Sequence, residues 1–110
     1  MTERASFDYR ELESLLNTPI RLAIMSILAS SDGAEFTSLR DLVGATDGNL
    51  SRHLFKLEEA GLIHVEKRFE GKKPVTWQRI TKTGRSVLRD YVVKLEAIIA
   101  SVNITNKKKE

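Results

Sequence analysis

Residues 37–61 read TSLRDLVGATDGNLSRHLFKLEEAG, and this stretch decides the fold. Thr37 and Thr46 each precede a helical pattern and are predicted N-caps, because their hydroxyls can accept a free backbone N–H. Gly44 and Gly61 stand where the two patterns end, as glycine often does after a helix. The stretch therefore predicts two short helices joined by a tight turn.

The flanking segments add helices before this stretch, and a hairpin and a long helix after it. Thr18 followed by Pro19 indicates a helix start, with threonine as the N-cap and proline at the first helical position. A polar turn between two β-rich runs predicts the hairpin. The expected elements are an amphipathic helix at 9–17, a helix at 19–30, an extended segment at 34–36, helices from 37 and at 46–60, strands at 62–69 and 75–80 around a turn at 70–74, and a helix at 81–102.

Composition excludes several classes of protein. The 110 residues are 41% hydrophobic and 30% charged, which is typical of one globular domain. There are no cysteines, so disulfides, thiolate metal sites and a cysteine nucleophile are excluded. We expect a single domain at 1–103 with a disordered tail at 104–110, a cytoplasmic location, no membrane span, no cofactor and no metal. Two lone histidines and no glycine-rich phosphate loop favour a protein that is not an enzyme.

The charge distribution points to a polyanionic partner. The whole chain carries a net charge of +3. Residues 66–85 alone hold seven lysines and arginines against two glutamates, which gives +5. Such a block is typical of nucleic-acid binding, although a charge run is more often only a solvated surface. The position of the block in the fold has to decide between the two.

The second predicted helix has an apolar stripe and a polar outer face. Leu54 and Leu57 fall within about 40° of Leu50 on a helical wheel. The opposite side has no carboxylate between Gly48 and Leu57, and it begins with small residues that permit close approach to a groove. In the order helix, turn, helix and hairpin, this pattern favours a helix that enters the major groove of DNA.

Four ordered motifs carry a family resemblance: GATDGNLSRHL at 44–54, KLEEAGLI at 56–63, FEGKKP at 69–74 and ITKTGR at 80–85. Together they resemble the winged-helix domain of bacterial transcriptional regulators, most closely the short MarR-like and ArsR-like dimeric repressors, over residues 19–88. The resemblance implies an α+β winged helix-turn-helix with a hairpin wing. It also implies a two-fold dimer that reads a pseudo-palindrome in double-stranded DNA.

The candidate DNA-binding residues lie on the second helix and the wing. Arg52 suits guanine and Asn49 suits adenine, although Asn49 could instead support the cap. Ser51, Lys56 and the wing lysines suit phosphate. We read Phe69 and Trp77 as sheet-core residues. The full candidate set is Thr46, Gly48, Asn49, Ser51, Arg52, Lys56, Arg68, Lys72 and Lys73.

The last predicted helix has an apolar face long enough to pack against a partner. Its apolar residues repeat with spacings of 4, 3, 4 and 3, which is the heptad pattern of helices that pack on one another. We therefore expect a homodimer through this helix. The candidate interface residues are Leu88, Tyr91, Val92, Leu95, Ile98, Ile99 and Val102. The serious alternative is a winged helix used for protein–protein assembly without DNA, which would favour an apolar or acidic outer face on the second helix.

Overall fold

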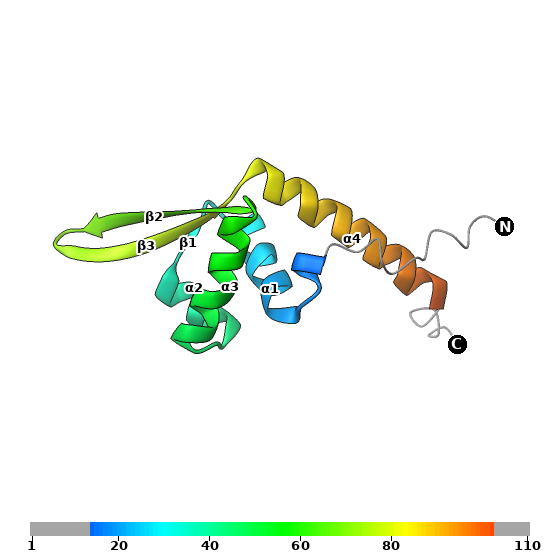
Figure 1. Ribbon diagram of the computed structural model, residues 1–110, viewed down its shortest axis with the longest axis horizontal. Coiled ribbons are helices and arrows are strands. Elements are labelled where there is room, and N and C mark those ends of the chain that lie inside the picture. Colours follow the sequence, from blue (N-terminus) through cyan, green and yellow to red (C-terminus); the bar gives the residue numbers. More distant parts are fainter. Residues whose placement is uncertain (1–13, 103–110) are drawn as a thin grey trace.

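The computed structural model describes residues 14–102, which form a winged-helix domain of the α+β class. Figure 1 shows a helical head from which the hairpin and the last helix project in opposite directions. The expected helix at 9–17 lies largely outside the described residues. The elements in chain order are η3 (Ser14–Leu16), α1 (Pro19–Ala29), β1 (Ala34–Glu35), α2 (Phe36–Val43), α3 (Asp47–Glu59), β2 (Ile63–Glu70), β3 (Lys73–Ile80) and α4 (Lys82–Val102).

The sheet is antiparallel with the strand order β1-β3-β2, and the wing is the β2–β3 hairpin. Its ladder runs from Ile63 opposite Ile80 to Glu70 opposite Lys73. The turn is therefore only two residues long, and the prediction that residues 70–74 form it is wrong. Gly71 takes a φ of 66° there, a conformation that glycine adopts without strain.

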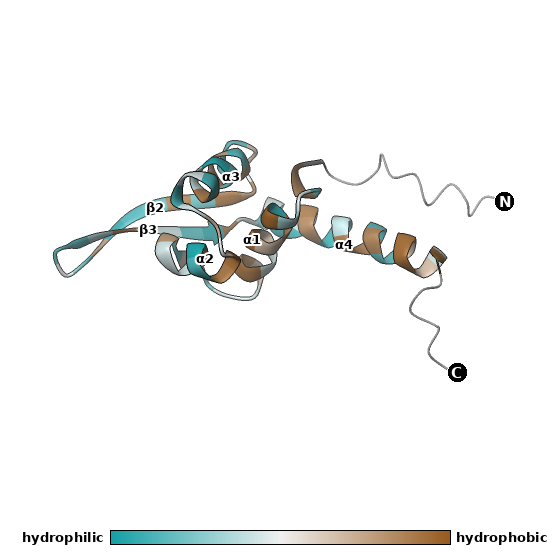
Figure 2. Cartoon of the chain, turned by 90° about the horizontal axis from the view of Figure 1, so that it is seen from below, coloured by the Kyte–Doolittle hydropathy of each residue, from teal (hydrophilic) through white to brown (hydrophobic). Residues whose placement is uncertain are grey.

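The core lies between the helices and one face of the sheet. Fully buried side chains of α1, α2 and α3 meet the base of the hairpin, where Ile63 and Ile80 are paired and buried. In Figure 2, α1 is mostly hydrophobic, the hairpin is largely hydrophilic and α4 alternates between the two. Beyond its base the hairpin buries few side chains, among them Val75 and Gln78, and its ladder holds the two strands together.

The predicted helix caps are confirmed in part. The Thr46 hydroxyl accepts the backbone N–H of Asn49 at 3.1 Å, as expected. Thr18 makes no side-chain cap bond, and its buried hydroxyl oxygen has no hydrogen-bond partner. The prediction that Thr37 caps the next helix is wrong, because Glu35 is held extended by pairing with Trp77 and α2 begins directly after it.

The last helix is anchored at its start by Thr81 and Gly84. The Thr81 hydroxyl accepts the Gly84 N–H at 2.9 Å and donates to the Gly61 carbonyl at 2.7 Å. Gly84 is buried against the Leu62 carbonyl, where a Cβ would overlap it. This close approach ties α4 to the residues that connect α3 with the wing.

Candidate nucleic-acid interface

Helix α3 buries the stripe that its sequence predicts. Leu50, Leu54 and Leu57 are buried in the core. The opposite side is open: Gly48, Ser51, Arg52, Phe55 and Lys56 are exposed, and Asn49 is half-buried. Between Gly48 and Leu57 the exposed side therefore offers hydrogen-bond donors and no carboxylate, and the exposed Glu58 and Glu59 follow at the C-terminal end of α3.

Asn49 and Arg52 act as a unit on this face. The Arg52 guanidinium donates to Asn49 Oδ1 over 2.6 Å, one helical turn away. The bond lies at the protein surface, so water can replace it at a small cost in free energy. It holds the guanidinium fork and the amide together at the N-terminal half of α3, where both remain available to base edges or phosphates.

His53 and Arg21 connect α3 to the segment before α1. Arg21 donates through Nε to the Leu15 carbonyl at 2.6 Å, and its Nη1 lies 3.1 Å from His53 Nδ1. Since arginine is only a donor, Nδ1 must accept and the ring is neutral. Burial, followed by the charges of Arg21, Arg52 and Lys56, lowers the pKa of His53. Arg21 thus links α1 to the Leu15 carbonyl and to α3.

An ion pair fixes the turn between α2 and α3. Arg40 donates to Asp47 at 2.9 Å and to Asp41 at 3.2 Å. The two acids raise the pKa of Arg40, chiefly through these hydrogen bonds. Asp47, the first residue of α3, thus pairs with a cation from α2.

The strand register shows which wing side chains lie on each of the two faces of the hairpin. Side chains alternate along a strand, so Val65, Lys67 and Phe69 share one face. This is the face toward α3, because Val65 lines a cavity of about 160 Å³ together with Ser51 and other α3 residues. Phe69 is 74% exposed, so its prediction as a sheet-core residue is wrong. Lys67, which is absent from the candidate set, is exposed on the face toward α3.

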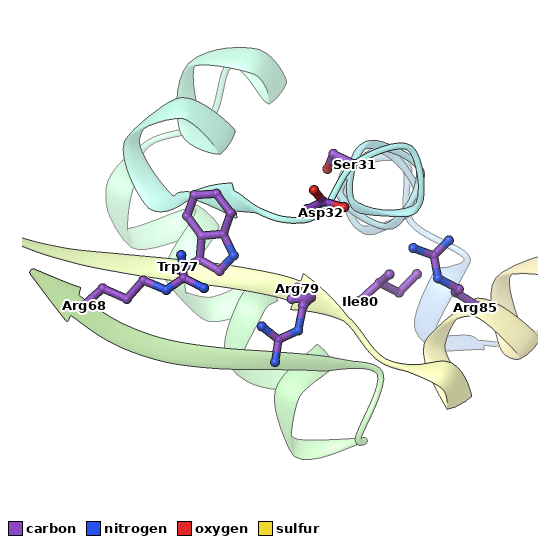
Figure 3. A pocket seen from close by; sticks show the side chains of 7 residues that line it. All are labelled: Ser31, Asp32, Arg68, Trp77, Arg79, Ile80 and Arg85. Atoms are coloured by element: carbon purple, nitrogen blue, oxygen red, sulfur yellow. The ribbon is translucent and has the colours of Figure 1, made fainter. Parts of the chain in front are cut away.

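Arg68 lies on the face away from α3. Its Nε donates to Glu66 at 2.7 Å, and its guanidinium stands over the Trp77 ring, 4.6 Å from the centroid. Figure 3 shows the two side chains together at a cavity of about 500 Å³ that Arg79 and Arg85 also line. Glu66 keeps a lowered pKa mainly through Arg68. Arg68 is therefore held by other groups, unlike the lysines of the wing tip.

The structure brings together six of the nine candidate DNA-binding residues on one helix. Lys72 lies in the two-residue turn, and Lys73 is the first residue of β3. Arg68 is the candidate that points elsewhere. The six that share α3 or its N-cap are Thr46, Gly48, Asn49, Ser51, Arg52 and Lys56.

The apolar stripe of α4 divides into two parts. Leu88 and Tyr91 are buried against their own domain, and Leu95 packs against the same core. Beyond them the stripe is open to solvent, with Ile99 42% and Val102 53% exposed. Val92 is also exposed, whereas Ile98 is half-buried.

Within residues 14–102, no three histidine, aspartate or glutamate side chains gather as metal ligands. No helix in this part of the chain is both long and apolar enough to cross a membrane.

Comparison with known proteins places the chain in a family. The family of winged helix DNA-binding domains matches residues 20–99. The uncharacterized protein MJ0432 of Methanocaldococcus jannaschii is 32% identical over 81 residues, which are 74% of this chain and 88% of that protein. A transcriptional regulator homologue from Pyrococcus horikoshii OT3 superposes with a TM-score of 0.83 at 27% identity, over 91% of this chain and 99% of the other.

The crystal structure of MarR has the same fold, with a TM-score of 0.76 at 21% identity over 98% of this chain and 78% of MarR. The resemblance to MarR-like regulators that the sequence suggests is thereby confirmed at the level of the fold. With the match over residues 20–99, the chain belongs to the winged helix DNA-binding domain family.

Proposed function

We propose that the chain is a transcriptional regulator that binds specific double-stranded DNA as a homodimer and acts as a repressor. One observation carries the proposal: between Gly48 and Leu57, α3 presents an exposed and mostly polar face without a carboxylate, next to a basic wing. The similarity to a transcriptional regulator homologue supports it. In this proposal the chain is not an enzyme and needs no cofactor.

Helix α3 is the reading element of the proposed complex. Its N-terminal turn is small and open at Gly48, so the backbone can come close to the groove floor. Arg52 offers a fork to guanine O6 and N7, and Asn49 offers its amide to adenine. Ser51 and Lys56 lie on the same exposed side and contact phosphates, which position α3 without reading sequence.

The wing is the anchoring element. Lys72 in the turn and Lys73 beside it are exposed and contact phosphates. Lys67 joins them, because it faces α3 and no ion pair involving it is found among residues 14–102. Arg68 contributes the least of the original set, since Glu66 and Trp77 already hold its guanidinium.

The distal stripe of α4 is the dimer contact. An apolar helix face that projects from its domain into water gains free energy when a second copy covers it. Ile99 and Val102, together with Val92 nearer the domain, are stripe residues that the domain itself leaves exposed. Two copies related by a two-fold axis present two α3 helices to successive half-sites of a pseudo-palindrome.

The test is binding of a labelled mixed-sequence duplex, followed by fluorescence anisotropy at several salt concentrations. We expect affinity to fall linearly on a log–log plot with salt, because each phosphate contact releases counterions. Lys72→Ala should make this slope shallower by about one unit. The matched control is Lys82→Ala, which removes an equal exposed charge at the start of α4 and should leave the slope unchanged. Absence of binding at low salt would favour the protein-assembly alternative instead.

A further inference from the structure

Phe69 and Pro74 form an exposed apolar pair near the wing tip. They lie directly opposite each other in the β2–β3 ladder. Phe69 is 74% exposed, and Pro74 is exposed as well. Proline is tolerated here because β1 pairs only with Trp77 and Gln78, so this end of β3 has β2 as its only neighbour within the described sheet.

The surroundings of this pair are cationic. Lys67 precedes Phe69 by two residues on the same face, and Lys72 lies in the adjoining turn. Lysine is depleted from the centres of protein–protein interfaces, where aromatic side chains gather. An aromatic side chain among lysines therefore suits a polyanion that also offers an apolar surface, and the stacked bases of a duplex provide one.

The position of the pair matches the geometry of a duplex. Val65 marks the place where α3 meets this face of the wing. Phe69 is four residues further along the strand, which is about 13 Å. A major groove and the next minor groove on the same side of DNA are half a helical turn apart, roughly 17 Å. With α3 in the major groove, Phe69 thus reaches the edge of the adjacent minor groove.

We propose that Phe69 and Pro74 enter this minor groove as an apolar wedge that partly unstacks one base step and bends the duplex. The inference rests on the proposed DNA-binding function and adds a specificity element to it. Apolar side chains between base steps unstack them and kink the helix. Pyrimidine–purine steps deform most easily, so the wedge favours a TA or CA step beside each half-site. Lys67 and Lys72 hold the phosphates on either side.

The experiment uses duplexes that the parent protein selects from a random pool. The step opposite the wing is set to TA or to the stiffer AA, with 2-aminopurine at that step as a fluorescent probe of stacking. We expect the parent to raise the probe fluorescence and to bind the TA duplex about tenfold more tightly, a difference of about 1.4 kcal/mol. Phe69→Ala should lose both effects, and Phe69→Leu should keep them. Lys72→Ala should weaken binding to both duplexes alike.

Other results would overturn the inference. If Phe69→Ala keeps the fluorescence rise and the step preference, the pair is not a wedge, while salt-dependent binding would still support the proposed function. If Phe69→Ala instead changes the sedimentation mass, the pair belongs to a protein contact. If the parent binds no duplex at any salt concentration, the proposed function and the wedge fail together. Because Phe69 packs on no core, its replacement should leave the fold intact.

Discussion

Replacing Gly84 by alanine should destabilise the fold, although alanine is the better helix former. A Cβ at Gly84 would overlap the Leu62 carbonyl oxygen and come within 2.9 Å of Ile80 Cγ1. That oxygen cannot move freely, because it accepts the Thr81 N–H at 3.0 Å and the Thr81 hydroxyl at 3.1 Å. Overpacking costs about 1–3 kcal/mol and a weakened hydrogen bond about 1 kcal/mol. Helix propensity returns about 1 kcal/mol, which leaves a net loss of about 2 kcal/mol.

The assay is thermal unfolding followed by circular dichroism at one fixed protein concentration. At 4–8 °C per kcal/mol for a domain of this size, Gly84→Ala should lower Tm by about 8–16 °C. Gly48→Ala is the matched control, because nothing lies within 4 Å of a Cβ at that helical position. It should leave Tm unchanged or raise it by a few degrees. A Gly84→Ala protein that melts at or above the parent would refute the reasoning about this contact.

Three further changes test other parts of the account. Ile99→Glu puts a charge in the open stripe of α4 and should cost several kcal/mol of association, seen as a monomer in sedimentation, whereas Ser101→Glu on the other side of α4 should keep the parent mass. Arg52→Ala should weaken a selected site by about 1–3 kcal/mol and relax its base preference; Lys72→Ala should not alter that preference, and the reverse pattern would exchange the two roles. His53 has a lowered pKa in the folded chain. Below pH 6.5 the unfolded chain therefore takes up a proton more readily than the folded chain, and stability falls. His53→Gln should flatten the dependence of Tm on pH between pH 7 and 5, and an unchanged dependence would contradict this.

Local signals were sufficient for most elements. The pattern around Thr46 predicts α3 to within a residue, because a cap bond, an apolar stripe and a terminal glycine all agree. The same agreement places Gly44 at the end of α2. The predicted cap at Thr37 is wrong because Glu35 pairs with Trp77, and this contact between distant parts of the chain sets where α2 begins.

The faces of the wing could not be read from composition alone. They depend on the register, and a one-residue shift in the turn exchanges the two faces. We read Phe69 as a core residue because it is an aromatic residue in a β-rich run, and Lys67 stayed outside the candidate set. Alternation along β2 from Val65, which contacts the α3 side, puts Phe69 and Lys67 toward α3 and Arg68 away from it. The contact between Arg21 and His53 likewise joins segments whose proximity the sequence does not encode locally.

Selection of duplexes from a random pool by the full-length protein, followed by sequencing, tests the central claim most directly. A dimer with two α3 helices should enrich an inverted repeat whose half-site centres lie about 10 base pairs apart, or a multiple of that spacing. The enriched site should bind at least about 10³-fold more tightly than a scrambled duplex at the same salt concentration. A pool that yields no motif, or a motif that binds no better than the scrambled duplex, would contradict a sequence-specific regulator.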